Sequence, residues 1–189
     1  MRALLTAFIP ENNMSEFRID LKNIREIIPS LKAGDSVYLS GVCYTARDAA
    51  HKKLFSLLDE GRELPIDIKD ACIYFAGPTP TPEGLPIGSC GPTTSGRMDP
   101  YSPRLLDLGL AAMIGKGKRN AGVVDAIVRN KAVYFCAIGG AGALCARSIA
   151  EYEEIAFPEL GCESIKRLVL RDFPAYVGID CCGNSIYKD

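Results

Sequence analysis

The sequence predicts an α/β domain built on a largely parallel central sheet. From Pro100 onward, helix-like and strand-like segments alternate, which is typical of βα units. The composition agrees, since 48% of the residues are apolar and 24% are charged, as in ordinary globular proteins. A length of 189 residues suits one domain better than two. We therefore expect a loose N-terminal extension over residues 1–14 and a single domain over residues 15–189.

Hydrophobic periodicity locates the elements of this domain. Some segments repeat apolar residues with helical spacing, and others form short buried runs that are typical of strands. Three strand-like segments at 168–171, 175–181 and 185–187, with a turn at 182–184, predict a C-terminal β hairpin. The elements expected before them are helix 20–31 (broken near Pro29), strand 36–45, helix 46–60 (with Thr45 as its cap), strand 71–76, helix 103–108, strand 111–114, helix 121–130, strand 132–138, helix 142–150 and strand 152–157.

Residues 77–99 interrupt this order with a loop that is rich in proline and glycine. A linker between two units is one interpretation of such a segment. The composition does not change across it, however, and this favours a loop inside one fold. Long irregular loops in compact domains are usually either functional or disordered.

The charge balance argues against two classes of partner. The chain has 22 Lys and Arg against 23 Asp and Glu, a formal net charge of −1, so no global field directs it to nucleic acid or to an anionic membrane. No apolar run reaches the roughly 18 residues of a membrane span, and residues 1–10 lack the cleavage site of a signal peptide. We expect a cytoplasmic protein that binds neither nucleic acid nor membranes.

The cysteines show no metal-binding pattern. Cys72 and Cys136 lie in apolar strand-like runs, where cysteine behaves as a small hydrophobic residue. No C-x-x-C pair occurs and His51 is the only histidine, so we expect reduced thiols and no metal or iron–sulfur site within this chain. The eight cysteines are Cys43, Cys72, Cys90, Cys136, Cys145, Cys162, Cys181 and Cys182.

Three segments combine glycine or hydroxyl residues with a cation beside a predicted helix. Residues 91–99 (GPTTSGRMD) contain Arg97, whose planar guanidinium fits a carboxylate or a phosphate. Residues 115–119 (GKGKR) follow a predicted strand, and residues 138–147 (IGGAGALCAR) open a helix whose first N–H groups can bind an anion. Because the carboxyl ends of parallel strands share one edge of a sheet, the segments should meet there. The pattern indicates a site for a small anion, and a di-acid would suit two separate cations.

A structural interpretation stays open for each of these features, because glycine-rich turns often serve packing and single arginines often lie on the surface. Nucleotide motifs do not fit. Residues 109–116 have five residues instead of four between the glycines, and Gly117 replaces the Ser or Thr of a Walker-type loop. A dinucleotide fingerprint fails at Cys145, which stands where a glycine is required. His51, in an amphipathic helix, is open to a structural role or a site role.

Residues 91–101 (GPTTSGRMDPY) resemble the signature of class I iron–sulfur hydro-lyases. More specifically, the chain resembles the β subunit of two-subunit fumarate hydratases and of tartrate dehydratases, and the C-terminal domain of single-chain class I fumarases. The resemblance covers about residues 31–187. Further matching segments are KAGDSVYLSG (32–41), ARDAAHKKL (46–54), YFAGPTPTPEG (74–84), MIGKG (113–117), AIGGAGAL (137–144), ELGCESI (159–165) and DFPA (172–175).

The resemblance implies a division of labour between two chains. A partner α subunit would carry a 4Fe–4S cluster on three cysteines, and this chain would bind no cofactor itself. Similar to swivelling β/β/α domains, it would close over the cluster and bring cations to a dicarboxylate substrate. The expected assembly is a hetero-oligomer, with self-association open when the chain is alone. The implied reaction is the reversible hydration of fumarate to malate, and the alternatives are tartrate dehydration or a non-catalytic anion-binding or assembly subunit.

The resemblance also implies roles for individual residues. Arg97 is the expected ligand of a substrate carboxylate, with Arg147 as the second. Arg167 stands where single-chain relatives carry lysine, and because arginine hardly deprotonates, a lysine's proton chemistry would not transfer to it. The residues expected to act in catalysis are Arg97, Thr94, Arg147 and Arg167. The residues expected to bind substrate are Arg97, Ser95, Gly139, Gly140, Lys116 and His51.

Overall fold

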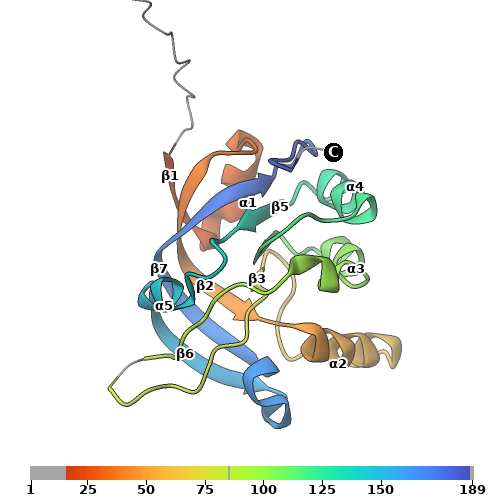
Figure 1. Cartoon of the computed structure of the whole chain (residues 1–189). Helices are drawn as coiled ribbons and strands as arrows, with labels where there is room; N and C mark the ends of the chain where they lie inside the picture. The colour runs from red at the N-terminus through yellow and green to blue at the C-terminus, as the bar shows by residue number, and fades with distance from the viewer. Residues whose placement is uncertain (1–15, 85, 188–189) are drawn as a thin grey trace, which may run out of the picture.

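A mixed sheet of seven strands organises the computed structural model, which describes residues 16–84 and 86–187 (Figure 1). The strands lie in the order β1-β2-β3-β4-β5-β7-β6. The predicted loose extension over residues 1–14 lies outside the described residues. The strands are β1 (Glu16–Asp20), β2 (Ser36–Thr45), β3 (Cys72–Tyr74), β4 (Ala112–Gly115), β5 (Val133–Cys136), β6 (Ile149–Ala156) and β7 (Ile165–Ile179).

The helices form where the apolar spacing predicts them, with ends that differ by a few residues. The helix expected over 20–31 is a succession of short turns, and its last turn contains Pro29. The helical elements are η1 (Leu21–Asn23), α1 (Ile24–Ile27), η2 (Ile28–Ser30), α2 (Asp48–Asp59), η3 (Ser95–Met98), α3 (Ser102–Asp107), α4 (Ala121–Arg129), α5 (Gly142–Arg147) and η4 (Pro158–Glu163).

The sheet is parallel from β1 to β5 and antiparallel where β7 joins it. Strand β7 pairs with β2 along most of its length, with β5 at its C-terminal part and with β6 at its N-terminal part. The pairings β2–β3–β4–β5–β7–β2 therefore form a closed ring. The chain is a mixed α/β protein, as predicted, and the finer assignment to the swivelling β/β/α domains stays a prediction.

Alternating residues of the central strands serve two separate cores. In β4, Ile114 belongs to the core enclosed by β2 and β7, whereas Met113 belongs to the core under the helices. Strand β5 repeats the pattern with Phe135 and Tyr134. This alternation follows from the two-residue period of a strand, which points successive side chains to opposite faces. Helices α2, α3 and α4 lie together on one side of the sheet (Figure 1) and cover the second core.

The strands on either side of the loop over residues 77–94, β3 and β4, pair directly in one sheet, which favours a loop over a linker between two units. One hydrogen bond joins the two arms of the loop, and another ties the loop to β3. Thr79 N–H donates to Ser89 O at 2.9 Å, and the Tyr74 hydroxyl donates to Cys90 O at 2.7 Å. Ile87 is buried in the first core, whereas residues 79–84 are exposed.

Strand β7 corrects two sequence predictions. Residues 168–171 and 175–181 are not separate strands but belong mostly to one long strand. The strand is irregular at Asp172, which lies in the left-handed region (φ 45°), because two residues of β7 stand opposite one residue of β2 there. The sequence interruption before Pro174 thus marks an irregularity within a strand. The expected C-terminal hairpin is reduced to a tight turn with one bridge between Ile179 and Ser185.

Two further differences concern the N-terminal half. The short strand β1 was not predicted, because five residues alternate too briefly to stand out. Thr45 does not cap α2: its hydroxyl donates to Ser164 O at 3.2 Å and accepts from Lys166 N–H at 3.0 Å, so it joins β2 to the start of β7. Among the described residues, no helix is long and apolar enough to cross a membrane.

Candidate active site

Parallel strands of the sheet end at one edge, and each is followed by residues that can bind a ligand. Arg47 and Asp48 follow β2, Gly77 follows β3, Lys116 follows β4 and Gly139 follows β5. Ligands of open α/β sheets collect outside the carboxyl ends of parallel strands, since the loops there carry free backbone groups and side chains. The candidate active site lies at this edge.

The three segments expected to bind an anion meet at the same edge. Thr94 forms a parallel bridge with Lys116, which joins the first segment to the second. A Cβ on Gly139 would lie 3.7 Å from Lys116 Nζ, so the lysine side chain runs over the turn that follows β5. Cys90, the residue directly before the first segment, donates its N–H to Gly142 O at 3.0 Å and so places the third segment beside the first. Lys116 thus stands between the other two segments.

Arg97 offers an open fork at this site. Its side chain is half exposed, and Nε donates to Asp48 Oδ1 at 2.9 Å. Neither of its terminal nitrogens has a partner among residues 16–84 and 86–187. Two parallel N–H groups of a guanidinium match the two oxygens of a carboxylate. Both terminal nitrogens of Arg97 are therefore available to a carboxylate, and its role as a substrate ligand stays a prediction.

Arg47 is a candidate that the sequence reasoning missed. Its Nη2 lies 3.2 Å from Glu163 Oε1, and its Nε is buried without a partner in the described part of the chain. It packs so closely on Gly77 that a Cβ there would lie 3.0 Å from Arg47 Nη1. A signal was present in the sequence, because Arg47 directly follows a predicted strand, as Lys116 does.

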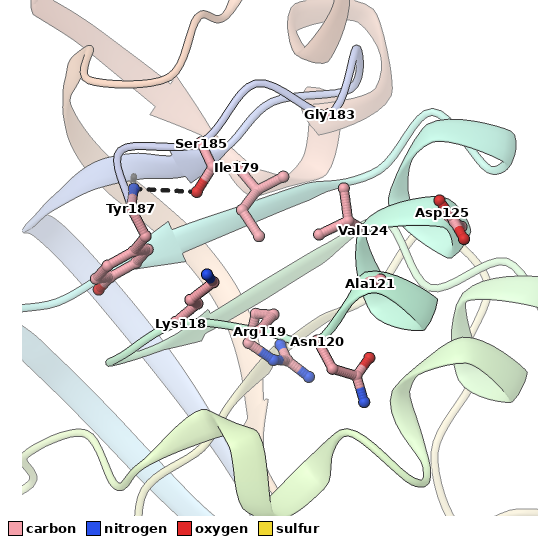
Figure 2. Close-up of a pocket in the computed structure, with 10 residues that line it drawn as sticks. All are labelled: Lys118, Arg119, Asn120, Ala121, Val124, Asp125, Ile179, Gly183, Ser185 and Tyr187. Atoms are coloured by element: carbon pink, nitrogen blue, oxygen red, sulfur yellow. Dashed lines mark hydrogen bonds between the residues drawn. The ribbon is translucent and has the colours of Figure 1, made fainter. Parts of the chain in front are cut away.

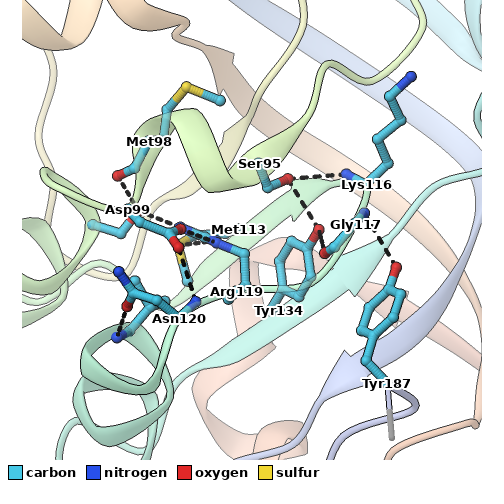
Figure 3. Close-up of polar contacts among 12 residues, drawn as sticks. Ser95, Met98, Asp99, Met113, Lys116, Gly117, Arg119, Asn120, Tyr134 and Tyr187 are labelled. Atoms are coloured by element: carbon cyan, nitrogen blue, oxygen red, sulfur yellow. Dashed lines mark hydrogen bonds and ion pairs between the residues drawn. The ribbon is translucent and has the colours of Figure 1, made fainter. Parts of the chain in front are cut away.

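A buried polar network holds the backbone of Lys116 and Gly117, the residues that follow β4 (Figure 3). Lys116 N–H donates to Ser95 Oγ at 2.9 Å, and Ser95 N–H donates to Lys116 O at 2.9 Å. The Tyr134 hydroxyl lies 2.9 Å from Ser95 Oγ and donates to Gly117 O at 3.0 Å. Gly117 N–H donates to the Tyr187 hydroxyl at 3.1 Å. Burial raises the pKa of Tyr187 to about 12 and that of Tyr134 further, so both hydroxyls stay protonated at neutral pH.

Two residues expected to bind substrate are completely buried in this structure. Ser95 is occupied by the network under Lys116, and His51 lies in the core beneath α2. The His51 ring packs against Phe75 and Tyr101 at centroid distances of 5.7 and 5.4 Å. Burial lowers the pKa of His51 to about 4, so the neutral ring donates from Nδ1 to Arg47 O at 2.8 Å. As placed, both residues support the site and do not reach a ligand.

Arg119, the last cation of the GKGKR segment, is also structural. Its side chain is fully buried, and Nε donates to Asp99 Oδ1 at 2.6 Å while Nη2 donates to Ser102 Oγ at 2.6 Å. The guanidinium also lies over the rings of Phe75 and Tyr134. Figure 2 shows the cavity of about 450 Å³ beside it, between the start of α4 and the C-terminal segment. Arg119 brings no free charge to that cavity.

Arg147 and Arg167 lie beside the exposed part of the 77–94 loop. Arg147, at the end of α5, lines a groove of about 560 Å³ with Ile87 and several small residues. Arg167, in β7, lines a shallower hollow against β6. Neither cavity includes Arg97 or Lys116, so the structure does not bring the four cations together. Carboxylate binding by Arg147 and Arg167 stays a prediction.

The turn after β5 is exposed at the site edge. Gly140 has a φ of 82°, in the left-handed region that favours glycine, and both Gly139 and Gly140 present their backbone to solvent. A side chain on Gly139 would meet Lys116. The two glycines are thus positioned for a close backbone approach to a ligand.

The donor set of the described residues does not fit a metal or an iron–sulfur cluster. Residues 16–84 and 86–187 contain no group of three His, Cys, Asp or Glu side chains that could hold a metal ion. Cys72 and Cys136 are buried in the core, as predicted. Burial raises the thiol pKa of Cys43 and Cys90, which opposes the thiolate form that a metal needs.

Comparison with known proteins identifies the family. The model of the family "Fumarase C-terminus" matches residues 3–189. The chain is 42% identical over 177 residues to the anaerobic class I fumarate hydratase of Escherichia coli and 39% identical over 188 residues to fumarate hydratase 2 of Leishmania major. These matches cover 90% and 95% of this chain but 32% and 33% of the relatives, so the chain spans about a third of their length.

A relative of similar length also matches. The putative L(+)-tartrate dehydratase subunit beta of Methanocaldococcus jannaschii is 36% identical over 174 residues, which cover 89% of each chain. A family match over almost the whole chain and these identities leave one conclusion. The chain belongs to the fumarase C-terminus family.

Proposed function

We propose that this chain is the β subunit of a two-subunit hydro-lyase that reversibly hydrates fumarate to malate. The observation that carries the proposal is the gathering of Arg47, Arg97 and Lys116 around one edge of the sheet. Several cations at one edge favour a substrate with more than one negative charge. The family and the relatives named as fumarate hydratases support the same reaction.

The proposal assigns the 4Fe–4S cluster to a partner α subunit. Two observations on the described residues support this assignment: they contain no group of side chains that could hold a metal ion, and burial raises the thiol pKa of the five buried cysteines, Cys43, Cys72, Cys90, Cys136 and Cys145. This chain matches about a third of the length of the fumarate hydratase relatives. The unmatched part of those relatives would correspond to such a partner. A cytoplasmic hetero-oligomer is part of the proposal.

This chain's own residues bind and orient the di-acid. Arg97 holds one carboxylate through its two terminal nitrogens, and Arg47 and Lys116 face the rest of the substrate. Thr94, exposed beside Lys116, adds a hydroxyl donor. Hydration adds a proton to one carbon of the C=C bond and hydroxide to its neighbour. Negative charge builds on the carboxylate next to the protonated carbon, so a cation bound there stabilises the transition state more than the ground state.

Tartrate is the second candidate substrate, because the relative that matches over 89% of both chains is named as a tartrate dehydratase subunit. The two substrates are four-carbon di-acids, and the same cations would hold either one. A non-catalytic anion-binding or assembly role is the remaining alternative. It would not require an arginine such as Arg97, whose two terminal nitrogens have no partner among the described residues.

The test is reconstitution. The purified chain is titrated with its cluster-bearing partner under anaerobic conditions, and fumarate hydration and tartrate dehydration are assayed in parallel. We expect activity that saturates with added chain and that is absent from either subunit alone. Iron and sulfide analysis of the isolated chain should find no stoichiometric cluster. A cluster on this chain, or a complex that acts on neither substrate, would contradict the proposal.

A further inference from the structure

The first turn of α2 concentrates unsatisfied polar atoms. Within residues 16–84 and 86–187, the buried side-chain nitrogen and oxygen atoms without a hydrogen-bond partner are Arg47 Nε, Asp48 Oδ2 and His51 Nε2. Folded proteins pair nearly all buried polar groups, and exceptions need a reason. Three exceptions within five residues mark this turn as built for more than folding.

Asp48 binds the guanidinium of Arg97 through its Nε–H group. Oδ1 accepts from Nε at 2.9 Å, so the contact uses neither of the two terminal nitrogens. Asp48 is the better buried of the two, with 23% of its side chain exposed against 50% for Arg97. As the first residue of α2, it also lies where the helix dipole favours a negative charge. It is thus a fixed anchor for a more mobile partner.

The neighbouring arginine is held in the same manner. Glu163 places Oε1 3.2 Å from Arg47 Nη2, and its Oε2 accepts from Ala49 N–H at 2.9 Å. Arg47 and Arg97 therefore each form an ion pair with one carboxylate. A carboxylate that only neutralised Arg97 would match its two oxygens to two nitrogens, whereas Asp48 leaves Oδ2 unused.

From this geometry we infer that Asp48 is a positioning residue, which holds Arg97 by Nε so that both terminal nitrogens face a substrate carboxylate. The inference rests on the proposed function, because it assumes a carboxylate ligand at Arg97. An arginine with free torsions would have to be ordered by the ligand, and a misplacement of about 1 Å can cost on the order of 100-fold in rate. Asp48 removes that cost before the substrate arrives.

The test compares Asp48→Ala and Asp48→Asn with Asp59→Ala in the reconstituted complex. Asp59 ends the same helix and pairs with Arg104, so it is a matched control. Binding is measured with succinate, an unreactive four-carbon di-acid. Asp48→Ala should weaken succinate binding and lower kcat/KM by about 100-fold, Asp48→Asn should lose less because its amide oxygen still accepts from Nε, and Asp59→Ala should change neither.

A second readout does not depend on activity. The Nε–H resonance of Arg97 in the isolated chain, assigned by its loss in Arg97→Lys, should lose its protection from solvent exchange in Asp48→Ala and keep it in Asp59→Ala. Unchanged protection, or unchanged succinate binding in a variant that is merely less stable, would overturn the inference. If the wild-type complex transforms neither fumarate nor tartrate but its succinate affinity still depends on Asp48, the proposed function fails and this inference stands.

Discussion

The two ends of helix α2 carry the same pair of residues in different surroundings. At its start Asp48 binds Arg97, and at its end Asp59 binds Arg104. The arginines are similarly exposed, at 50% and 44%, but Asp59 is 67% exposed and Asp48 only 23%. Arg104 also lies over the ring of Phe55, whereas Arg97 lies over no aromatic ring of the described residues.

This difference shows how position decides what an ion pair does. A pair between exposed groups contributes little, about 0–1 kcal/mol, because water and salt screen it. At the end of α2, Arg104 mainly offsets an aspartate that the helix dipole disfavours. At the start, the same chemistry lies beside buried, unsatisfied atoms and the carboxyl ends of parallel strands. There, the pair orients a side chain toward a ligand.

The largest expected effect comes from the buried ion pair of Arg119 and Asp99. Arg119→Met removes the buried partner of Asp99 and leaves that carboxylate without its cation, which costs about 3–5 kcal/mol of unfolding free energy. Urea titration of the isolated chain measures the loss. Arg129→Met is the control, since Arg129 pairs with Asp107 on the surface and its loss should shift the urea midpoint far less. Equal shifts would show that the Arg119 cluster is not an anchor.

The next effect concerns Arg97, the partner of Asp48 at the start of α2. Arg97→Lys replaces a planar fork with a point charge in a site that the substrate desolvates. Loss of a desolvated charge pair costs about 2–5 kcal/mol, which corresponds to a decrease of kcat/KM of about 30-fold to several thousand-fold. The melting temperature should hardly change, because Arg97 is half exposed. An unaltered kcat/KM for fumarate and tartrate in an active complex would remove Arg97 from the site.

A pH effect separates the buried start of α2 from its exposed end. Burial lowers the pKa of His51 from 6.5 to about 4 in the folded chain, so the native state favours the neutral ring. Its contribution to stability is complete above pH 6.5 and is lost as the pH falls toward 4, by about 3 kcal/mol. Urea midpoints between pH 7 and pH 4 measure the slope. His51→Asn, which cannot titrate but can donate to Arg47 O, should flatten it, and a slope that persists would assign it to other groups.

The smallest effect is expected at the exposed end. Arg104→Lys keeps the charge near Asp59 and should leave kcat/KM nearly unchanged, with a stability change below about 1 kcal/mol. The same assays that detect Arg97→Lys provide the measurement. A large loss of activity in Arg104→Lys would mean that the two ends of α2 do not differ in function.

Local chemistry explains why so much of the fold could be predicted. Strand β2 begins and ends at the predicted residues, and the helices at α2 and α4 differ from the expected ranges by a few residues. The spacing of apolar residues shows which side chains must be buried. This spacing is a property of short segments of the sequence, so it can be recognised without the tertiary structure. Strand β7 was divided in the prediction because only its partner β2 reveals the bulge at Asp172.

For the site, the sequence by itself determined the residue types and the loops that carry them: the fork of Arg97, the lysine after β4 and the glycines after β5. Only the tertiary structure decided which of these residues meet. It buried Ser95, His51 and Arg119, added Arg47 and Asp48, and set Arg147 and Arg167 beside another part of the loop. The physical reason is that charge and hydrogen-bonding capacity belong to single residues. Exposure and partnership are created by segments far apart in the chain, when the strands pair and the helices cover them.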